Sequence, residues 1–255
     1  MVPWEPVQLN FASREVTMKL VYYGPALSGK TTNLRALHDL TSEESRGRLM
    51  TLETKDDRTL FFDMLPLVFR AEPSADGKRH GMSLRVKVFT VPGQVLHAST
   101  RRVVLQGADG VAFIADSQNA ETHANAASYV DLQGNLQELG VDIKNFPLVI
   151  QFNKRDLPDV RSDAEIESLA QRGREPVFKA CAVSGSGVLE SFFGLLQLTW
   201  AKLEAEHQLA RSIGIDAAGF LPLVARKIGF TGDVWSLVDS RIGGHIDRVA
   251  GGRSA

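Results

Sequence analysis

The sequence predicts an α/β fold, with a mostly parallel sheet of six to seven strands and helices on both faces. Short β-branched and apolar runs alternate along the chain with segments of helical period, as in strands joined by crossover helices. A phosphate-loop pattern lies between the first such strand and the first such helix. The chain has 255 residues and is 44% apolar, which is enough for one substantial domain plus an appendage.

The first unit is a strand, a loop and a helix. Residues 16–23 are rich in β-branched, aromatic and apolar residues, and residues 32–40 carry leucines at helical spacing. Residues 24–31 between them match G-x-x-x-x-G-K-[ST]. In such a loop the backbone N–H groups surround an anion, and the dipole of the following helix favours it. We expect Lys30 to contact the β- and γ-phosphates and Thr31 to bind Mg²⁺.

The nucleotide contacts predicted for this unit extend one residue past the motif. They are Gly24, Pro25, Ala26, Leu27, Ser28, Gly29, Lys30, Thr31 and Thr32. A chance match in a glycine-rich turn is the alternative, and the flanking strand and helix argue against it.

A second motif indicates which base is bound. Asn153, Lys154 and Asp156 form an N-K-x-D run directly after the apolar residues 146–152. A carboxylate at Asp156 can accept from the two donors on the guanine edge, which adenine lacks, and unpaired polar groups reject the wrong base. The pattern alone is usually a solvated turn. Its place at a strand end downstream of a phosphate loop predicts guanine.

A third motif lies between the other two. The alternating strand 84–89 leads into Thr90-Val91-Pro92-Gly93-Gln94. Here a GTPase keeps the glycine that senses the γ-phosphate and the residue that orients the attacking water, roles that suit Gly93 and Gln94. Thr90 occupies the position usually held by an aspartate near Mg²⁺. The alternative is an ordinary Pro-Gly turn at a strand end.

Five segments together resemble the bacterial MglA family of small Ras-like GTPases, which control cell polarity and gliding motility. They are residues 22–25, 57–63, 90–94, 115–118 and 153–158. The resemblance covers residues 8–204 and implies a Ras-like P-loop GTPase fold. It also implies GTP and GDP as ligands, and residues 60–69 and 84–91 as the one antiparallel strand pair.

The resemblance implies roles for individual residues. Arg58 would be an arginine finger supplied in cis, Thr59 would ligate Mg²⁺ in the GTP state, and Gln94 would position the water. With Lys30 they form the expected catalytic set, and Cys181 is placed among the nucleotide-binding residues. The implied partners are a roadblock-fold GTPase-activating protein and a motility or polarity effector.

One residue departs from the family pattern. Ala26 lies where the family generally has glycine, and its methyl group could crowd the catalytic side chains. Two functions therefore stay open: an active GTPase switch, or a hydrolysis-impaired GTP-binding scaffold that acts through its C-terminal extension.

Because Thr90 offers no carboxylate, a third metal-site residue is expected elsewhere. Asp63 lies on the strand that follows Thr59, in the apolar run 60–65, where an unpaired acid would be costly to bury. We expect Asp63 to serve the Mg²⁺ site; the alternative is an edge-strand aspartate that faces water.

The remaining elements follow from periodicity. A buried strand is predicted at 110–115, and helices are predicted at 163–171 and 191–206. Residues 72–81 form a polar, turn-rich insert, which is either a flexible solvated loop or a partner contact.

The sequence predicts two regions, a GTPase domain at 8–204 and a C-terminal extension at 205–255. The extension is too apolar for a linker, and residues 234, 238, 242 and 246 can line one helix face. It is expected to form one or two helices that pack on the GTPase domain or on a second copy. The alternative is a docking element for a motility or envelope component.

Composition excludes several classes of function. The net charge of −1 argues against bulk binding to nucleic acid or to an anionic membrane. One cysteine permits no internal disulfide, and the six histidines form no metal-spaced cluster. No signal peptide or membrane span is predicted, so we expect a cytoplasmic protein that partners can recruit to a cell pole or inner membrane.

Overall fold

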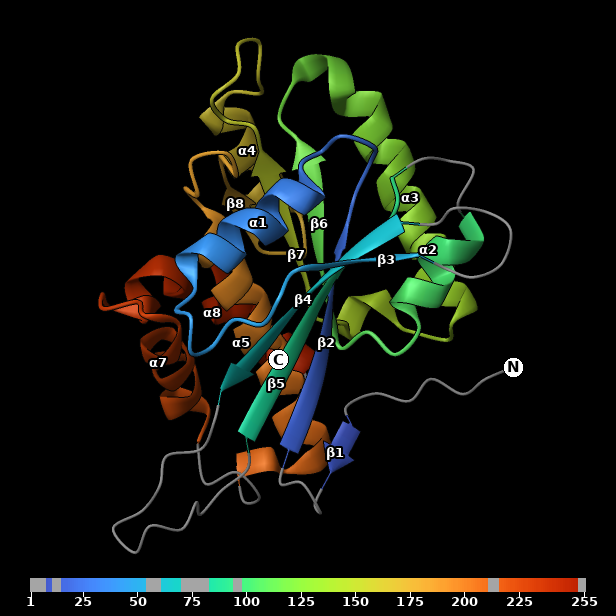
Figure 1. The fold of residues 1–255 in the computed structure, drawn as a ribbon. Helices are drawn as coiled ribbons and strands as arrows, with labels where there is room; N and C mark the ends of the chain where they lie inside the picture. The colour runs from blue at the N-terminus through green and yellow to red at the C-terminus, as the bar shows by residue number, and fades with distance from the viewer. Residues whose placement is uncertain are drawn as a thin grey trace, which may run out of the picture.

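A computed structural model of the chain describes residues 8–10, 15–53, 61–69, 83–93, 98–210 and 216–251 (Figure 1). The strands are β1 (Gln8–Asn10), β2 (Glu15–Tyr23), β3 (Met50–Glu53), β4 (Phe61–Phe69), β5 (Ser83–Thr90), β6 (Gly110–Asp116), β7 (Leu148–Asn153) and β8 (Val177–Lys179). The helices are α1 (Lys30–Leu40), α2 (Ala98–Leu105), α3 (Thr122–Glu138), α4 (Asp163–Arg172), α5 (Val188–His207), α7 (Ala217–Ile228) and α8 (Val234–Val249), with short 3₁₀ turns η2 (Asn119–Glu121) and η3 (Ile143–Asn145).

The predicted mostly parallel sheet is confirmed. Its strand order is β3-β4-β5-β2-β6-β7-β8, and β1 pairs with β2 off this path. The pairs β2·β5, β2·β6, β6·β7 and β7·β8 are parallel. Seven strands on the main path match the predicted number, and the three-residue β1 adds an eighth.

The expectation of a single antiparallel pair is wrong. The predicted pair β4·β5 is present, and β3·β4 and β1·β2 are antiparallel as well. β3 and β1 have only four and three residues, too few to show an alternating pattern in the sequence. The insert at 72–81 lies outside the described residues.

The sheet has one apolar core on each face. Along β2, Met18, Leu20 and Tyr22 face the core that includes α1, α5, α7 and α8. Val21 and Tyr23 face the opposite core, which is covered by α2, α3 and α4. This alternation is the period-two pattern of a strand buried on both sides.

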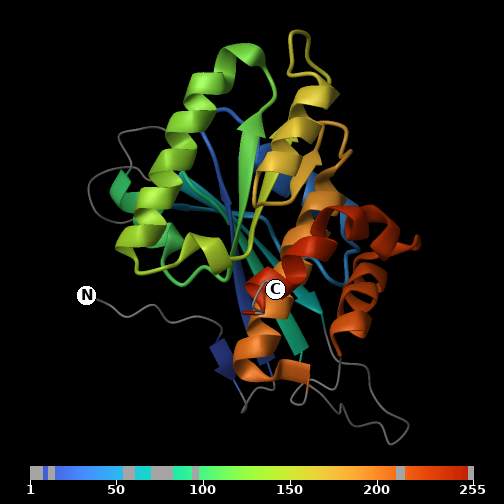
Figure 2. The same cartoon turned by 180° about the vertical axis from the view of Figure 1, so that it is seen from behind.

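The chain continues past α5 into two more helices that share the first core (Figure 2). Trp200 of α5 stacks on Phe220 of α7 with ring centroids 4.0 Å apart. On α8, Val234, Val238 and Ile242 are buried, so the four-residue spacing lines the packed face of a helix. As a result α5 is covered by the sheet on one side and by α7 and α8 on the other.

Side-chain caps set where several helices begin. Ser162 and Glu165 form a reciprocal capping box at the start of α4. Asp216 and Asp233 accept backbone N–H bonds at the starts of α7 and α8. Within the described ranges, no helix is both long enough and apolar enough to cross a bilayer.

Candidate nucleotide-binding site

The predicted motifs meet at one edge of the sheet. Residues 24–29 follow β2, residues 153–156 begin at the last residue of β7, and residues 180–182 follow β8. These three strands run parallel within the sheet, so the loops after them leave from the same edge. Ligands of open α/β sheets bind at this carboxyl edge.

The phosphate loop holds a buried cation. Lys30 Nζ lies 2.9 Å from the Gly24 carbonyl oxygen and 2.6 Å from that of Pro25, and the residue is only 7% exposed. Burial, and secondarily the charge of Arg101, lowers the Lys30 pKa to about 8. Among the described residues no carboxylate pairs with this ammonium group. A buried cation held only by carbonyl oxygens fits a phosphate ligand.

Asn153 connects two loops of the site. Its amide nitrogen donates to the Ser28 carbonyl at 2.9 Å, and its amide oxygen accepts from the Ala182 N–H at 2.9 Å. Gly29, with φ 95°, lies so close that a Cβ there would be 2.2 Å from the Asn153 side chain. A side chain at Gly29 would therefore be excluded both by its backbone conformation and by this contact.

The rest of the predicted base-binding run is only partly buried. Lys154 has φ 66°, and its amino group lies 2.6 Å from the Asp116 carboxylate. Asp156 is exposed, and no described residue pairs with its carboxylate. Cys181 is half-buried, and its backbone N–H donates to the Ser186 carbonyl at 2.9 Å. It lies beside Ala182, which bonds to Asn153.

Oxygen atoms gather around Asp63, at the start of α1. The Thr31 hydroxyl donates to one carboxylate oxygen of Asp63 at 2.6 Å, and the Thr51 hydroxyl donates to the other at 2.9 Å. The Thr90 hydroxyl accepts from the Asp63 backbone N–H at 2.9 Å and lies 3.5 Å from its carboxylate. Thr90, which has no carboxylate, thus lies beside the carboxylate of Asp63.

These oxygens fit a Mg²⁺ ion shared with a nucleotide. In the described part of the chain, no group of three or more His, Cys, Asp or Glu side chains could hold a metal alone. Mg²⁺ commonly binds through one or two protein oxygens together with substrate phosphates and water. A hydroxyl backed by a carboxylate, as at Thr31, suits that arrangement.

The structure describes part of the region where the γ-phosphate is expected. Gly93 packs against the phosphate loop, where a Cβ would be 2.4 Å from the Ala26 nitrogen. Ala26 and Leu27 are exposed, Leu27 with φ 61°, and Thr32 is half-buried in the first turn of α1. Arg58, Thr59 and Gln94 lie outside the described residues.

Sequence reasoning missed a buried polar network beneath the loop. The Gln151 amide on β7 donates to the Asn33 side chain at 2.9 Å and to the Ser191 hydroxyl at 2.7 Å. Asn33 in turn donates to the Gly29 carbonyl at 3.0 Å. The network joins the start of α1 to β7 and α5. A glutamine inside the apolar run of β7 was the signal that could have revealed it.

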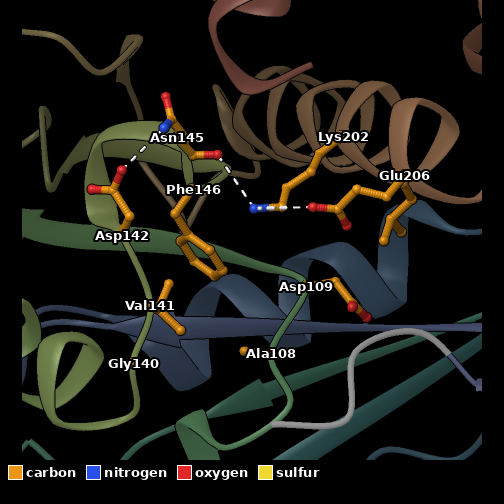
Figure 3. Close-up of a pocket in the computed structure, with 10 residues that line it drawn as sticks. Ala108, Asp109, Gly140, Val141, Asp142, Asn145, Phe146, Lys202 and Glu206 are labelled. Atoms are coloured by element: carbon orange, nitrogen blue, oxygen red, sulfur yellow. Dashed lines mark hydrogen bonds and ion pairs between the residues drawn. The ribbon is translucent and has the colours of Figure 1, made fainter. Parts of the chain in front are cut away.

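A pocket of about 250 Å³ lies elsewhere, next to residues that precede β6 and β7 (Figure 3). Lys202 Nζ lies there 3.6 Å from the Glu206 carboxylate and 3.5 Å from the Asn145 carbonyl oxygen. It opens at the amino ends of the parallel strands, which is not the edge that carries the motifs. It is therefore separate from the nucleotide site.

Comparison with known proteins identifies the family. No protein-family model matches the chain. The mutual gliding-motility protein MglA of Myxococcus xanthus is 41% identical over 196 residues, which are 77% of this chain and 97% of that protein. The similarity thus spans nearly the whole relative. The chain belongs to the MglA family of Ras-like small GTPases.

Proposed function

We propose that this protein is a GTP-driven switch that regulates cell polarity and gliding motility in a bacterium. The observation that carries the proposal is Lys30, an ammonium group that is 7% exposed and lies at hydrogen-bond distance from two loop carbonyls. The β- and γ-phosphates of GTP would supply the missing negative charge. The Asp156 carboxylate, which has no partner among the described residues, is available for the guanine edge.

The proposed metal site uses Thr31 and Thr59 as direct ligands and Asp63 as the carboxylate behind them. The 2.6 Å bond from Thr31 to Asp63 supports this assignment, because it directs the hydroxyl lone pairs away from the carboxylate. Bound Mg²⁺ would neutralise charge on the β- and γ-phosphates. Asp63 would supply the carboxylate near Mg²⁺ that other GTPases supply with an aspartate at the position equivalent to Thr90.

The proposed hydrolytic residues come from this chain alone. Lys30 would contact the γ-phosphoryl group, Arg58 would stabilise its charge in the transition state, and Gln94 would orient the attacking water. A roadblock-fold GTPase-activating protein would order Arg58 and Gln94 without inserting an arginine of its own. An effector, and recruitment to a cell pole or inner membrane through such partners, complete the proposal.

Multiple-turnover hydrolysis with and without a roadblock partner tests this function. Arg58→Ala should reduce partner-stimulated turnover by roughly 10³–10⁵-fold and leave GTP affinity nearly unchanged. Lys154→Ala, which breaks the ion pair with Asp116, is a control that should weaken nucleotide binding instead. Stimulated turnover that survives in Arg58→Ala would show that the arginine finger is absent or comes from the partner.

A hydrolysis-impaired scaffold is the second candidate, and Ala26 favours it. The Ala26 backbone lies against Gly93, which directly precedes Gln94 in the sequence, and in this second candidate the Ala26 methyl group would crowd the catalytic side chains. Wild-type protein that retains GTP without turnover in the presence of a roadblock partner would support the scaffold.

A further inference from the structure

The two C-terminal helices are fixed to the GTPase core. Besides the stack of Trp200 on Phe220, the ring of Phe230 after α7 meets Phe193 of α5 at 5.9 Å between centroids. On α8, Arg241 makes two bonds to the Glu167 carboxylate on α4, at 2.8 and 3.0 Å. Movement of α7 would therefore disturb α5 and its aromatic contacts.

The end of α7 is bonded to the segment that joins α1 to β3 (Figure 1). The Lys227 carbonyl accepts from the hydroxyls of Ser42 and Ser45, each at 2.7 Å. The Ile228 carbonyl accepts from the Ser42 N–H at 2.8 Å. The last carbonyls of a helix have no partner within it, so these three bonds satisfy groups that would otherwise need water. Ser45 is 4% exposed, so its bond is largely shielded from water.

The same segment is bonded to β4 on its other side. The Ser45 carbonyl accepts from the Val68 N–H at 2.8 Å, and the Gly47 N–H donates to the Pro66 carbonyl at 2.8 Å. Ser45 thus contacts α7 through its hydroxyl and β4 through its carbonyl. In the strand order β3 is an edge strand of the sheet, and β4 is its neighbour.

β4 also carries the carboxylate of the candidate metal site. Asp63 lies three residues before Pro66 on this strand and accepts from the Thr31 hydroxyl at 2.6 Å. A displacement of β4 along or away from the sheet would change that contact. The bonds of Ser42 and Ser45 to α7 oppose such a displacement, because α7 is packed on α5.

We infer that Ser42 and Ser45 are positioning residues for nucleotide binding, through which α7 holds β4 where Asp63 meets Thr31. The inference rests on the metal role proposed for Asp63. The C-terminal extension would thereby fix the β3–β4 side of the sheet against the core and slow the release of the Mg²⁺–nucleotide complex. Neither serine contacts the nucleotide site itself.

The test measures release of a fluorescent GDP from the full-length protein as a function of free Mg²⁺. In S42A/S45A, release at limiting Mg²⁺ should be about tenfold faster, equivalent to about 1.4 kcal/mol and within the range for one or two neutral hydrogen bonds. The difference from wild type should disappear at saturating Mg²⁺. Ser42→Thr keeps the hydroxyl and should restore most of the slow release when it is compared with Ser42→Ala.

Arg241→Gln is the matched control for general loosening of the extension. It removes the two bonds to Glu167 but leaves the segment at 42–45 untouched, so the melting temperature should fall while GDP release stays near wild type. Unchanged release in S42A/S45A overturns the inference, even where Asp63→Asn alters the Mg²⁺ requirement. Equal acceleration in Arg241→Gln at an equal loss of melting temperature also overturns it. Faster release in S42A/S45A with no effect of Asp63→Asn overturns it as well, because the two serines would then act without the metal role of Asp63 on which the inference rests.

Discussion

Replacing Asp63 by asparagine tests the role of its negative charge, because asparagine has nearly the same shape. The carboxylate accepts from the hydroxyls of Thr31 and Thr51 at 2.6 and 2.9 Å, and asparagine is nearly isosteric. The variant keeps one acceptor oxygen and loses the negative charge that would orient Thr31 toward Mg²⁺. We therefore expect the protein to fold normally and to require more Mg²⁺ to retain nucleotide.

The size of the effect follows from the type of hydrogen bond. A bond to a charged group contributes about 1.5–3 kcal/mol net. At about 1.4 kcal/mol per tenfold change, the Mg²⁺ concentration at half-maximal GDP retention should rise roughly 10- to 150-fold. The assay is the release rate of a fluorescent GDP at a series of free Mg²⁺ concentrations. At saturating Mg²⁺ the variant and the wild type should release GDP at similar rates.

Thr51→Val is the control for this prediction. It removes the hydroxyl on the other carboxylate oxygen and leaves the charge and the bond to Thr31 in place. Its Mg²⁺ midpoint should stay within about threefold of wild type, because the bond that is lost is exposed to water and contributes little net free energy. A wild-type midpoint in Asp63→Asn would refute the metal role. So would a GTP-bound structure in which Asp63 lies farther from Mg²⁺ than one bridging water.

Three further predictions concern the nucleotide. Asp156→Asn should lower GDP affinity by at least about 2 kcal/mol, roughly 30-fold, and shift preference toward xanthine nucleotides; equal affinity of the wild type for ATP and GTP in competition would contradict guanine recognition. The Lys30 pKa is lowered to about 8 in the free site. Above that pH the Lys30 amino group is neutral, and it has to bind a proton before it can pair with a phosphate. GDP affinity should then fall by up to about tenfold from pH 8 to pH 9, while guanosine, which lacks phosphates, should lose far less affinity, because only its own N1–H begins to titrate there. For the nucleotide-free protein, the free energy of unfolding should rise as the pH increases from about 8 to 10.5. In this range the unfolded lysine, with its ordinary pKa of 10.5, still binds a proton that the folded protein has lost. Ala26→Gly should raise stimulated GTP turnover by up to about a hundredfold, the scale of effect expected when a small steric displacement is relieved; unchanged turnover would remove the main support for the scaffold alternative.

Much of the fold was predictable because its signals are local. Residues 16–23, 110–115 and 146–152 are apolar runs of strand length, and they became β2, β6 and most of β7. Helices at 163–171 and 191–206 were predicted within three residues of the observed bounds at each end. Periodicity failed for β1 and β3, because strands of three or four residues are too short to carry a pattern of their own.

The sequence by itself determined the chemistry available at the site, because motif spacing fixes which backbone and side-chain groups face a nucleotide. Only the tertiary structure decided how those groups are supported. Asp63 meets Thr31 because antiparallel pairing brings β4 beside the end of β5, and the two residues are 32 positions apart. Gln151 bonds to Asn33 across 118 positions, and Ser45 bonds to Lys227 across 182. Such contacts follow from the packing of whole elements, and no local pattern of residues encodes which distant partner each polar group will find.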